Sequence, residues 1–178
     1  MKKIALPILI LLFVVGNITG QGKFSLSAGG NLAIPMGDFG DAVNMGFGAS
    51  VQGEYQFQEK LFGTATIGYL MWGGKDMDFG FGSIKSDFSA IPLMAGVKYF
   101  FAKGIYGHGQ LGLHFFSATV ETTGGLFGSS KSSASETEFA IGLGVGYEVS
   151  NWDLSALLNI ISDSNYIGIR AAYRFSLK

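Results

Sequence analysis

Residues 43–57, with the sequence VNMGFGASVQGEYQF, alternate between two kinds of side chain. One set is apolar, and the other contains no large apolar residue. Successive side chains of a β-strand point to opposite faces of the sheet, so this alternation predicts a strand with two different faces. The apolar set is interrupted only by Gly53 and consists of Val43, Met45, Phe47, Ala49, Val51, Tyr55 and Phe57.

Seven further segments extend this pattern along the chain. Residues 139–149 and 167–177 alternate nearly as cleanly, with glycine, alanine and a few charged residues opposite the apolar set. Glycine and β-branched residues recur with a period of two, which disfavours helices. The sequence therefore predicts eight strands. The five weaker segments cover about 23–34, 61–72, 88–101, 104–120 and 152–161.

The predicted connections alternate between long and short. The short ones are 58–60, 102–103 and 150–151, and the long ones include 35–42, 73–87 and 121–136. Transmembrane barrels combine tight periplasmic turns with longer external loops. This order predicts an antiparallel up-and-down barrel whose N-terminus lies on the periplasmic side.

The composition separates this barrel from a soluble β-sandwich, the main alternative fold. Charged residues make up only 14% of the chain, against about 25% in soluble domains. Mean hydropathy is +0.34, yet no apolar stretch after residue 22 is long enough for a membrane-spanning helix. A closed barrel is the other structure that satisfies its backbone hydrogen bonds in lipid. We therefore expect an all-β fold, an eight-stranded antiparallel transmembrane β-barrel.

Aromatic residues on the apolar face fall at two levels of the predicted barrel. These levels are about 25 Å apart along the membrane normal, which matches the apolar band of such barrels. Two aromatic rims therefore indicate that the apolar face meets lipid. The periplasmic rim is Phe24, Tyr55, Phe57, Tyr99, Tyr147, Trp152, Tyr173 and Phe175, and the external rim is Phe47, Tyr69, Phe115 and Phe139.

The first 22 residues have the layout of a secretory signal peptide. Lys2 and Lys3 precede an apolar run over residues 4–15, and small residues follow, with expected cleavage after Gly20 or Gly22. The run is shorter than the ~20 residues of a spanning helix. We therefore expect residues 1–22 to be a signal peptide and residues 23–178 to form the barrel domain. The absence of cysteine excludes lipoprotein acylation and disulfides.

The alternating, glycine-rich chain resembles the outer-membrane β-barrel domain family, which includes the small eight-stranded A-, X- and W-type porin-like proteins. The resemblance rests on this alternation, on IPMGDF at residues 34–39 and on AAYRF at residues 171–175. It implies a bacterial outer-membrane location and contact with lipid and lipopolysaccharide. It also implies delivery by periplasmic chaperones and the barrel-insertion machinery, as a monomer. The family usually ends on an aromatic residue, whereas three residues follow Phe175 here.

Several ionisable residues belong to the predicted inner face. Buried charges must be paired or solvated, so we expect the basic members to face the acidic ones. The network either forms a gate or proton-linked path, or it fills the lumen structurally; the narrowness of an eight-stranded barrel favours filling. The expected network is Glu54, Lys98, His108, Glu148, Asp153, Arg170 and Arg174.

Other positions give no evidence for chemistry. His108 and His114 are ~20 Å apart along one strand, too far to share a metal ion. His114 and Ser117 point to opposite faces, which disfavours a lipid-modifying enzyme. No catalytic, cofactor-binding or metal site is expected, and no basic patch indicates nucleic-acid binding.

Four apolar residues on the inner face either plug the lumen or mark a register slip, and Pro92 predicts a bulge or local break. These four residues are Phe62, Leu70, Met94 and Leu157.

The sequence thus predicts an integral outer-membrane protein with a non-enzymatic structural, surface-interaction or envelope-integrity role. A narrow pore for small or hydrophobic solutes is the first alternative, and a lipid-modifying enzyme is the second.

Overall fold

The computed structural model describes residues 23–75, 77–78, 83–123 and 130–176. The expected signal peptide lies outside the described residues. Among the described residues, no helix has the length and apolar character needed to cross a membrane. The elements are β1 (Phe24–Pro35), α2 (Gly37–Ala42), β2 (Val43–Gln58), β3 (Leu61–Gly74), β4 (Met77–Asp78), β5 (Ser83–Ala102), β6 (Ile105–Thr123), β7 (Ser130–Val149), β8 (Trp152–Ile161) and β9 (Tyr166–Ser176).

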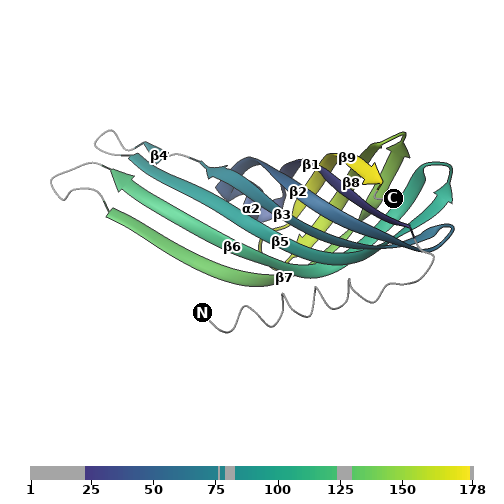
Figure 1. Cartoon of the computed structure of the whole chain (residues 1–178). Helices are drawn as coiled ribbons and strands as arrows, with labels where there is room; N and C mark the ends of the chain where they lie inside the picture. The colour runs from purple at the N-terminus through teal and green to yellow at the C-terminus, as the bar shows by residue number, and fades with distance from the viewer. Residues whose placement is uncertain (1–22, 76, 79–82, 124–129, 177–178) are drawn as a thin grey trace, which may run out of the picture.

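The eight long strands form one closed antiparallel barrel (Figure 1). Each pairs with its neighbours in sequence, and β3 pairs with β5 across the short β4. The first and last strands close the sheet, with pairs that run from Ser25–Ser176 to Pro35–Tyr166. Every long strand therefore has a partner on both sides. The predicted fold class is confirmed, and the soluble two-sheet sandwich is excluded.

The two faces of the wall differ as the alternation predicts. In β2, the side chains of Phe47 and Phe57 are 62% and 61% exposed on the outside of the barrel. Gln52 and Glu54, on the opposite face of the same strand, are 3% and 1% exposed and point into the lumen. An apolar exterior around a polar interior is the pattern of a transmembrane barrel.

Tight turns join the strands at one end of the barrel, close to where the sequence predicts them. We call it the periplasmic end, following the orientation that the sequence predicts, and the opposite end the external one. They are Glu59–Lys60, Lys103–Gly104 and Ser150–Asn151. Gly104 has φ of 77°, a left-handed conformation that glycine adopts without steric cost. At this end the aromatic rings of the rim pack on one another, as in the edge-to-face pair of Trp152 and Tyr173, with centroids 5.6 Å apart.

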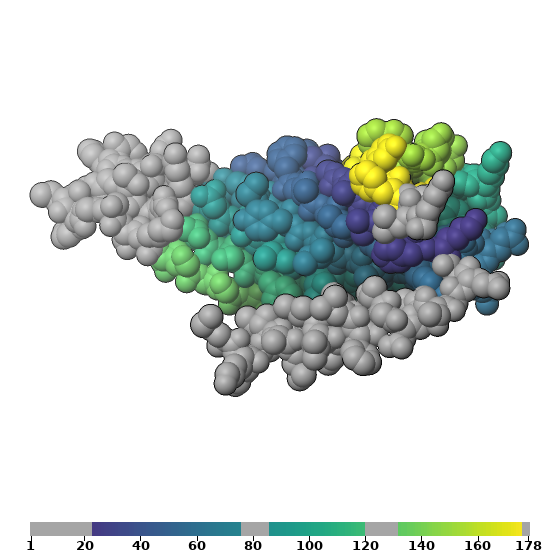
Figure 2. Space-filling view, viewed as in Figure 1, coloured from purple at the N-terminus to yellow at the C-terminus, as the bar shows by residue number. Residues whose placement is uncertain are grey.

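The external connections are shorter than predicted, because the strands are longer. Strands β5, β6 and β7 continue past the others as a protruding sheet (Figure 1), and the green end of β7 projects from the wall in Figure 2. The predicted loop 121–136 is wrong, since β6 runs to Thr123 and β7 begins at Ser130. Serine, threonine and glutamate occur on both faces of these strand ends. The sequence there lacks the alternation of apolar and polar residues by which the other strands are predicted.

Two other predicted loops also contain regular structure. Residues 73–87 hold the end of β3, all of β4 and the start of β5. Residues 35–42 hold the six-residue helix α2, which is too short to produce a helical hydrophobic period. Phe39, its only buried residue, turns toward the barrel mouth and fixes the helix there.

Pro92 interrupts one ladder without a bulge. Between β3 and β5 the pairs at Ile67–Leu93 and Leu70–Ala90 keep one register, and the pairs between them are missing. The ladder between β5 and β6 runs through Pro92 without a shift. Proline lacks the N–H that the β3 side requires, which explains the local break.

Glycines on the inner face allow neighbouring strands of this narrow barrel to pack closely. A Cβ at the inward-facing Gly144 would meet the carbonyl oxygen of Ala156 and lie 2.7 Å from the Cα of Leu157 on β8. A Cβ at Gly30, which faces lipid, would have its nearest neighbour at 4.0 Å. We expect Gly144→Ala to lower the free energy of unfolding by about 1–3 kcal/mol through overpacking. Gly30→Ala is the matched control and should leave it unchanged or raise it slightly. Urea unfolding in detergent micelles measures both, and equal effects would contradict close packing at Gly144.

Candidate functional site

The interior of the barrel is the candidate site, and it consists of three layers. Charged side chains fill the periplasmic half, a small cavity with polar and apolar lining residues lies midway, and aromatic side chains close the external end. Except for Phe39 of α2, the residues of these layers alternate with the lipid-facing set, so the period of the strands directs them inward.

Lys98 lies at the centre of the charged layer. Its Nζ is 2.6 Å from Oε1 of Glu54, 2.7 Å from Oδ2 of Asp153 and 3.3 Å from Oε1 of Glu148. Lys98 is 0% exposed, and Glu54 and Asp153 are each 1% exposed. The Nζ also lies 4.4 Å from the ring centroid of Tyr106. One ammonium group thus joins side chains from β2, β5, β6, β7 and β8.

The two arginines extend this layer on opposite sides. Arg170 lies 3.5 Å from Asp153 through Nη1, and its Nε and Nη2 donate to the hydroxyls of Ser50 and Ser27 at 3.0 and 2.9 Å. Arg174 pairs with Glu148 nearer the periplasmic mouth. Three cations therefore face three carboxylates, and the layer has no net charge. Buried charges of this kind are tolerated when each is paired and hydrogen-bonded.

His108 lies beside this layer but forms no ion pair in the described structure. Its Nε2 shares a hydrogen bond of 3.0 Å with the hydroxyl of Thr64 on β3. Six of the seven residues in the expected network therefore form ion pairs, and the seventh, His108, shares a hydrogen bond with the uncharged Thr64 instead.

Neutral side chains that the sequence analysis did not single out complete the hydrogen bonds. The hydroxyl of Tyr106 donates to Asp153, and the amide of Gln52 donates to Glu54 at 2.7 Å. The hydroxyl of Thr66 in turn donates to Oε1 of Gln52 at 3.0 Å. The alternation of the sequence already places these three side chains on the inner face. Their hydrogen-bond partners could not be predicted, because they depend on the stagger between strands that are far apart in the chain.

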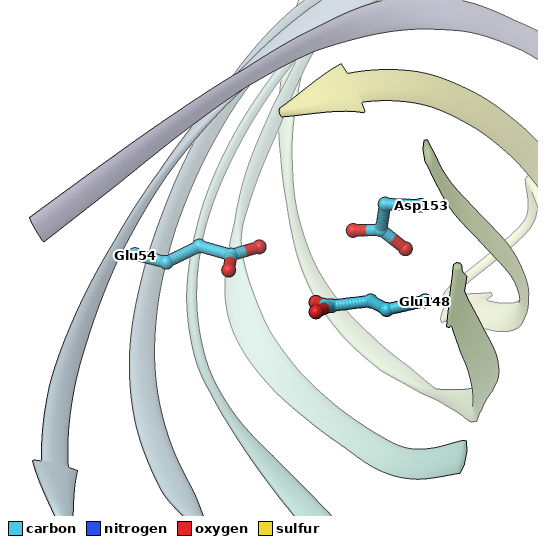
Figure 3. A group of neighbouring side chains, drawn as sticks. All are labelled: Glu54, Glu148 and Asp153. Atoms are coloured by element: carbon cyan, nitrogen blue, oxygen red, sulfur yellow. The ribbon is translucent and has the colours of Figure 1, made fainter. Parts of the chain in front are cut away.

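The three carboxylates of the charged layer have the composition of a metal site. Figure 3 shows Glu54, Glu148 and Asp153 pointing toward a common space, and their ligand oxygens lie within 4.8 Å of one another. The ammonium of Lys98 already occupies the position that neutralises them. This donor set therefore does not favour a divalent cation.

The aromatic layer closes the external end of the lumen. Phe39 from α2 packs edge-on against Trp72 of β3 at 5.5 Å, and Trp72 contacts Tyr166 of β9 at 5.6 Å. His114 is 0% exposed, shares a 2.9 Å hydrogen bond with the hydroxyl of Tyr166 and stacks on Phe116 at 5.8 Å. Rings from α2, β3, β6 and β9 thus meet across the barrel axis.

A cavity of about 70 Å³ separates the two filled layers. Ser50, Gln52 and Asn159 contribute polar groups to its lining, which suits it to hold water. Leu70, Met94 and Leu157 also face it, so these apolar residues plug the lumen and no register slip occurs at them. Phe62 is only half-buried and packs edge-to-face against Phe100 near the periplasmic mouth.

A family model described as the outer membrane protein beta-barrel domain matches residues 5–177. The chain belongs to this family. The family resemblance predicted from the sequence is therefore confirmed, and the protein is an integral β-barrel of the bacterial outer membrane. No curated protein sequence matches the chain.

Solved structures with the same fold come from several bacteria. The chain resembles the attachment invasion locus protein Ail of Yersinia pestis, crystallised with the heparin analogue sucrose octasulfate, with a TM-score of 0.62 and 20% identity. That alignment covers 88% of this chain and all of Ail. Neisserial surface protein A has a TM-score of 0.53 at 16% identity, over 89% of this chain and all of that one.

The N-terminal β-barrel domain of Pseudomonas aeruginosa OprF has a TM-score of 0.51 at 16% identity, over 87% of this chain and all of that one. At these identities the likenesses establish the fold alone.

Among single substitutions that neutralise a residue of the charged layer, those at Lys98 should lower the free energy of unfolding the most. Lys98→Met removes the cation between Glu54 and Asp153 and leaves buried carboxylates without compensation, so we expect a loss of about 3–5 kcal/mol in unfolding free energy. Urea titration in micelles measures the loss, with the exposed Lys60→Met as control. Adding Glu54→Gln and Asp153→Asn should restore part of the stability. A Lys98→Met barrel as stable as the wild type would contradict the central position of this ammonium.

Proposed function

We propose that this protein acts without catalysis at the bacterial cell surface, as a sealed barrel that anchors an external sheet for interaction or envelope integrity. The observation that carries the proposal is the combination of a lumen filled in two layers with strands that protrude beyond it. The first feature disfavours transport through the barrel, and the second offers a surface for recognition.

The filled lumen supports a structural role for the charged layer. Its six ionic groups are mutually paired, and Lys98 and Asp153 are almost completely buried. An ion that crossed the barrel would have to separate these pairs and then displace Trp72 and Tyr166. Both steps remove buried partners, which is costly in an apolar wall.

The protruding sheet supports a surface role. Strand β8 ends opposite Ala140, so residues 130–139 of β7 have no strand on that side within the described part of the chain. This edge is about 33 Å long at ~3.3 Å per residue. A free strand edge presents unpaired N–H and C=O groups that can bind an extended peptide. The edge sequence SKSSASETEF is polar, which is compatible with exposure to water.

The remaining features of the proposal follow from export and membrane location. Residues 1–22 would direct secretion and be removed, and periplasmic chaperones and the insertion machinery would deliver the barrel. The apolar wall would contact lipid on all sides, as expected of a monomer, and the external rim would adjoin lipopolysaccharide. A narrow pore and a lipid-modifying activity are the alternatives that the following measurements would reveal.

Planar bilayers test the sealed lumen. The purified, folded protein should give no reproducible unit conductance step at moderate voltage, because both halves of its lumen are filled. Lys98→Ala combined with Trp72→Ala, which opens both layers, should increase ion flux if the double variant still folds, as judged by faster migration of the unheated sample on gels. A defined step in the wild type would favour the pore.

Single cysteines test which end faces outward, since the natural chain has none. A membrane-impermeant maleimide should label Ser133→Cys, on the protruding sheet, in intact cells. Lys103→Cys, in a periplasmic turn, should react only after the outer membrane is permeabilised. The reverse labelling pattern would contradict a surface role for the sheet, and labelling of neither would contradict membrane insertion.

A further inference from the structure

A second hollow lies at the external mouth, outside the filled lumen. It has a volume of about 380 Å³ and lies between α2, the protruding sheet and the connection before β9. Three phenylalanines line it: Phe39 from α2, Phe88 from β5 and Phe116 from β6. Pockets that bind small molecules have volumes of ~300–1,000 Å³ and mostly apolar walls with a few polar groups. Its size and lining therefore suit a small ligand.

The strand register explains how this lining is assembled. Phe88 lies opposite Ala118, and Ala118 lies opposite Ala134, so small residues leave space beside the ring on the inner face of the sheet. One pair further into the barrel, Phe116 lies opposite Glu136. The hollow is thus a consequence of the small residues Ala118 and Ala134 on the adjacent strands β6 and β7, beside Phe88 of β5.

The charged groups that line the hollow are acidic, and the hydroxyls of Ser117, Ser135 and Ser164 are its other polar side-chain groups. Glu136 and Glu138 both line it, and no basic residue does so in the described part of the chain. Carboxylates held together beside aromatic rings favour a cation, because both the charges and the ring faces attract it.

In the described part of the chain, one unpartnered polar atom belongs to a residue that lines the hollow, and two others belong to neighbouring residues of the lumen, His114 and Trp72, which do not line it. Oε2 of Glu138 is buried and has no hydrogen-bond partner in the described structure. The residue opposite it on β6 is His114, which is completely buried and has an unpartnered Nδ1. The only other such side-chain atom among the described residues is Nε1 of Trp72, in the adjoining aromatic layer. Buried polar atoms without partners call for a missing donor or acceptor.

We propose that this hollow binds a small organic cation, an ammonium group carried on an aromatic or other apolar body. The apolar body packs among Phe39, Phe88 and Phe116, and the ammonium group donates its hydrogens toward Glu136 and Glu138. The inference deepens the surface role proposed above and relies on that role only for access from outside.

A fluorescence titration tests this binding directly. Trp72 contacts Phe39 at 5.5 Å and Phe116 at 6.3 Å, so its emission reports on the hollow. The chain has two tryptophans, and Trp152→Phe leaves Trp72 as the single reporter. Phenethylammonium is the probe, and 2-phenylethanol is its neutral analogue of similar size. In folded barrels in micelles, phenethylammonium should give a saturable change, and 2-phenylethanol should bind about tenfold more weakly or worse.

The acidic residues supply the matched variants. Glu136→Gln with Glu138→Gln should weaken phenethylammonium binding by about tenfold or more, since both carboxylates are lost while size is kept. Glu59→Gln, at an exposed turn of the opposite mouth, is the control and should bind like the parent. Faster migration of the unheated protein on gels verifies that each variant is folded.

Three results would overturn the proposal. They are equal binding of 2-phenylethanol, undiminished binding by the double glutamine variant, and the absence of any saturable response. A response to hexalysine but not to phenethylammonium would also overturn it, in favour of the basic side chains of a protein partner. The titration uses purified protein in micelles, so a negative result would say nothing against the proposed surface role. Conversely, a conductance step or a reversed labelling pattern would contradict the surface role without affecting the result of the titration.

Discussion

Every backbone N–H and C=O group that crosses a bilayer must find its hydrogen-bond partner inside the protein, because hydrocarbon supplies none. The pairing of β1 with β9 satisfies this constraint by closing the sheet, so that the first and last strands have no free edge. Closure with eight strands also fixes a narrow lumen, which side chains must fill. The inward glycines and the plugging residues Leu70, Met94 and Leu157 are consequences of this geometry.

The narrow lumen explains why its contents divide into layers. Charged groups near the periplasmic mouth form a neutral set around Lys98, where one ammonium group serves carboxylates from separate strands. Aromatic rings near the external mouth close the barrel by packing, with Phe39 supplied by α2. Buried ion pairs contribute little net stability over apolar filling, but removal of one partner is costly. The charged layer therefore adds little stability over apolar filling, but each of its groups depends on its partners on other strands.

Much of the fold could be predicted from the sequence, because an alternating period of two specifies both the strand and its faces. The inward direction of Glu54, Lys98 and Asp153 follows from that period alone. The partners in each ion pair depend on the stagger between strands, which periodicity does not record. The protruding sheet could not be foreseen, since serine and threonine occupy both of its faces. Helix α2 is likewise too short to leave a periodic signal.

Closure is the central claim, and a disulfide across the first and last strands measures it most directly. Leu32 lies opposite Ile169 in the closing ladder, and the natural chain contains no cysteine. Directly opposed residues have Cα separations of about 4.5–5.5 Å, within the range that a disulfide spans. Leu32→Cys with Ile169→Cys should oxidise nearly completely in the folded, membrane-inserted protein, whereas Leu32→Cys with Ala171→Cys, two residues out of register, should not. Failure of the first pair to cross-link in folded protein would contradict the closed barrel.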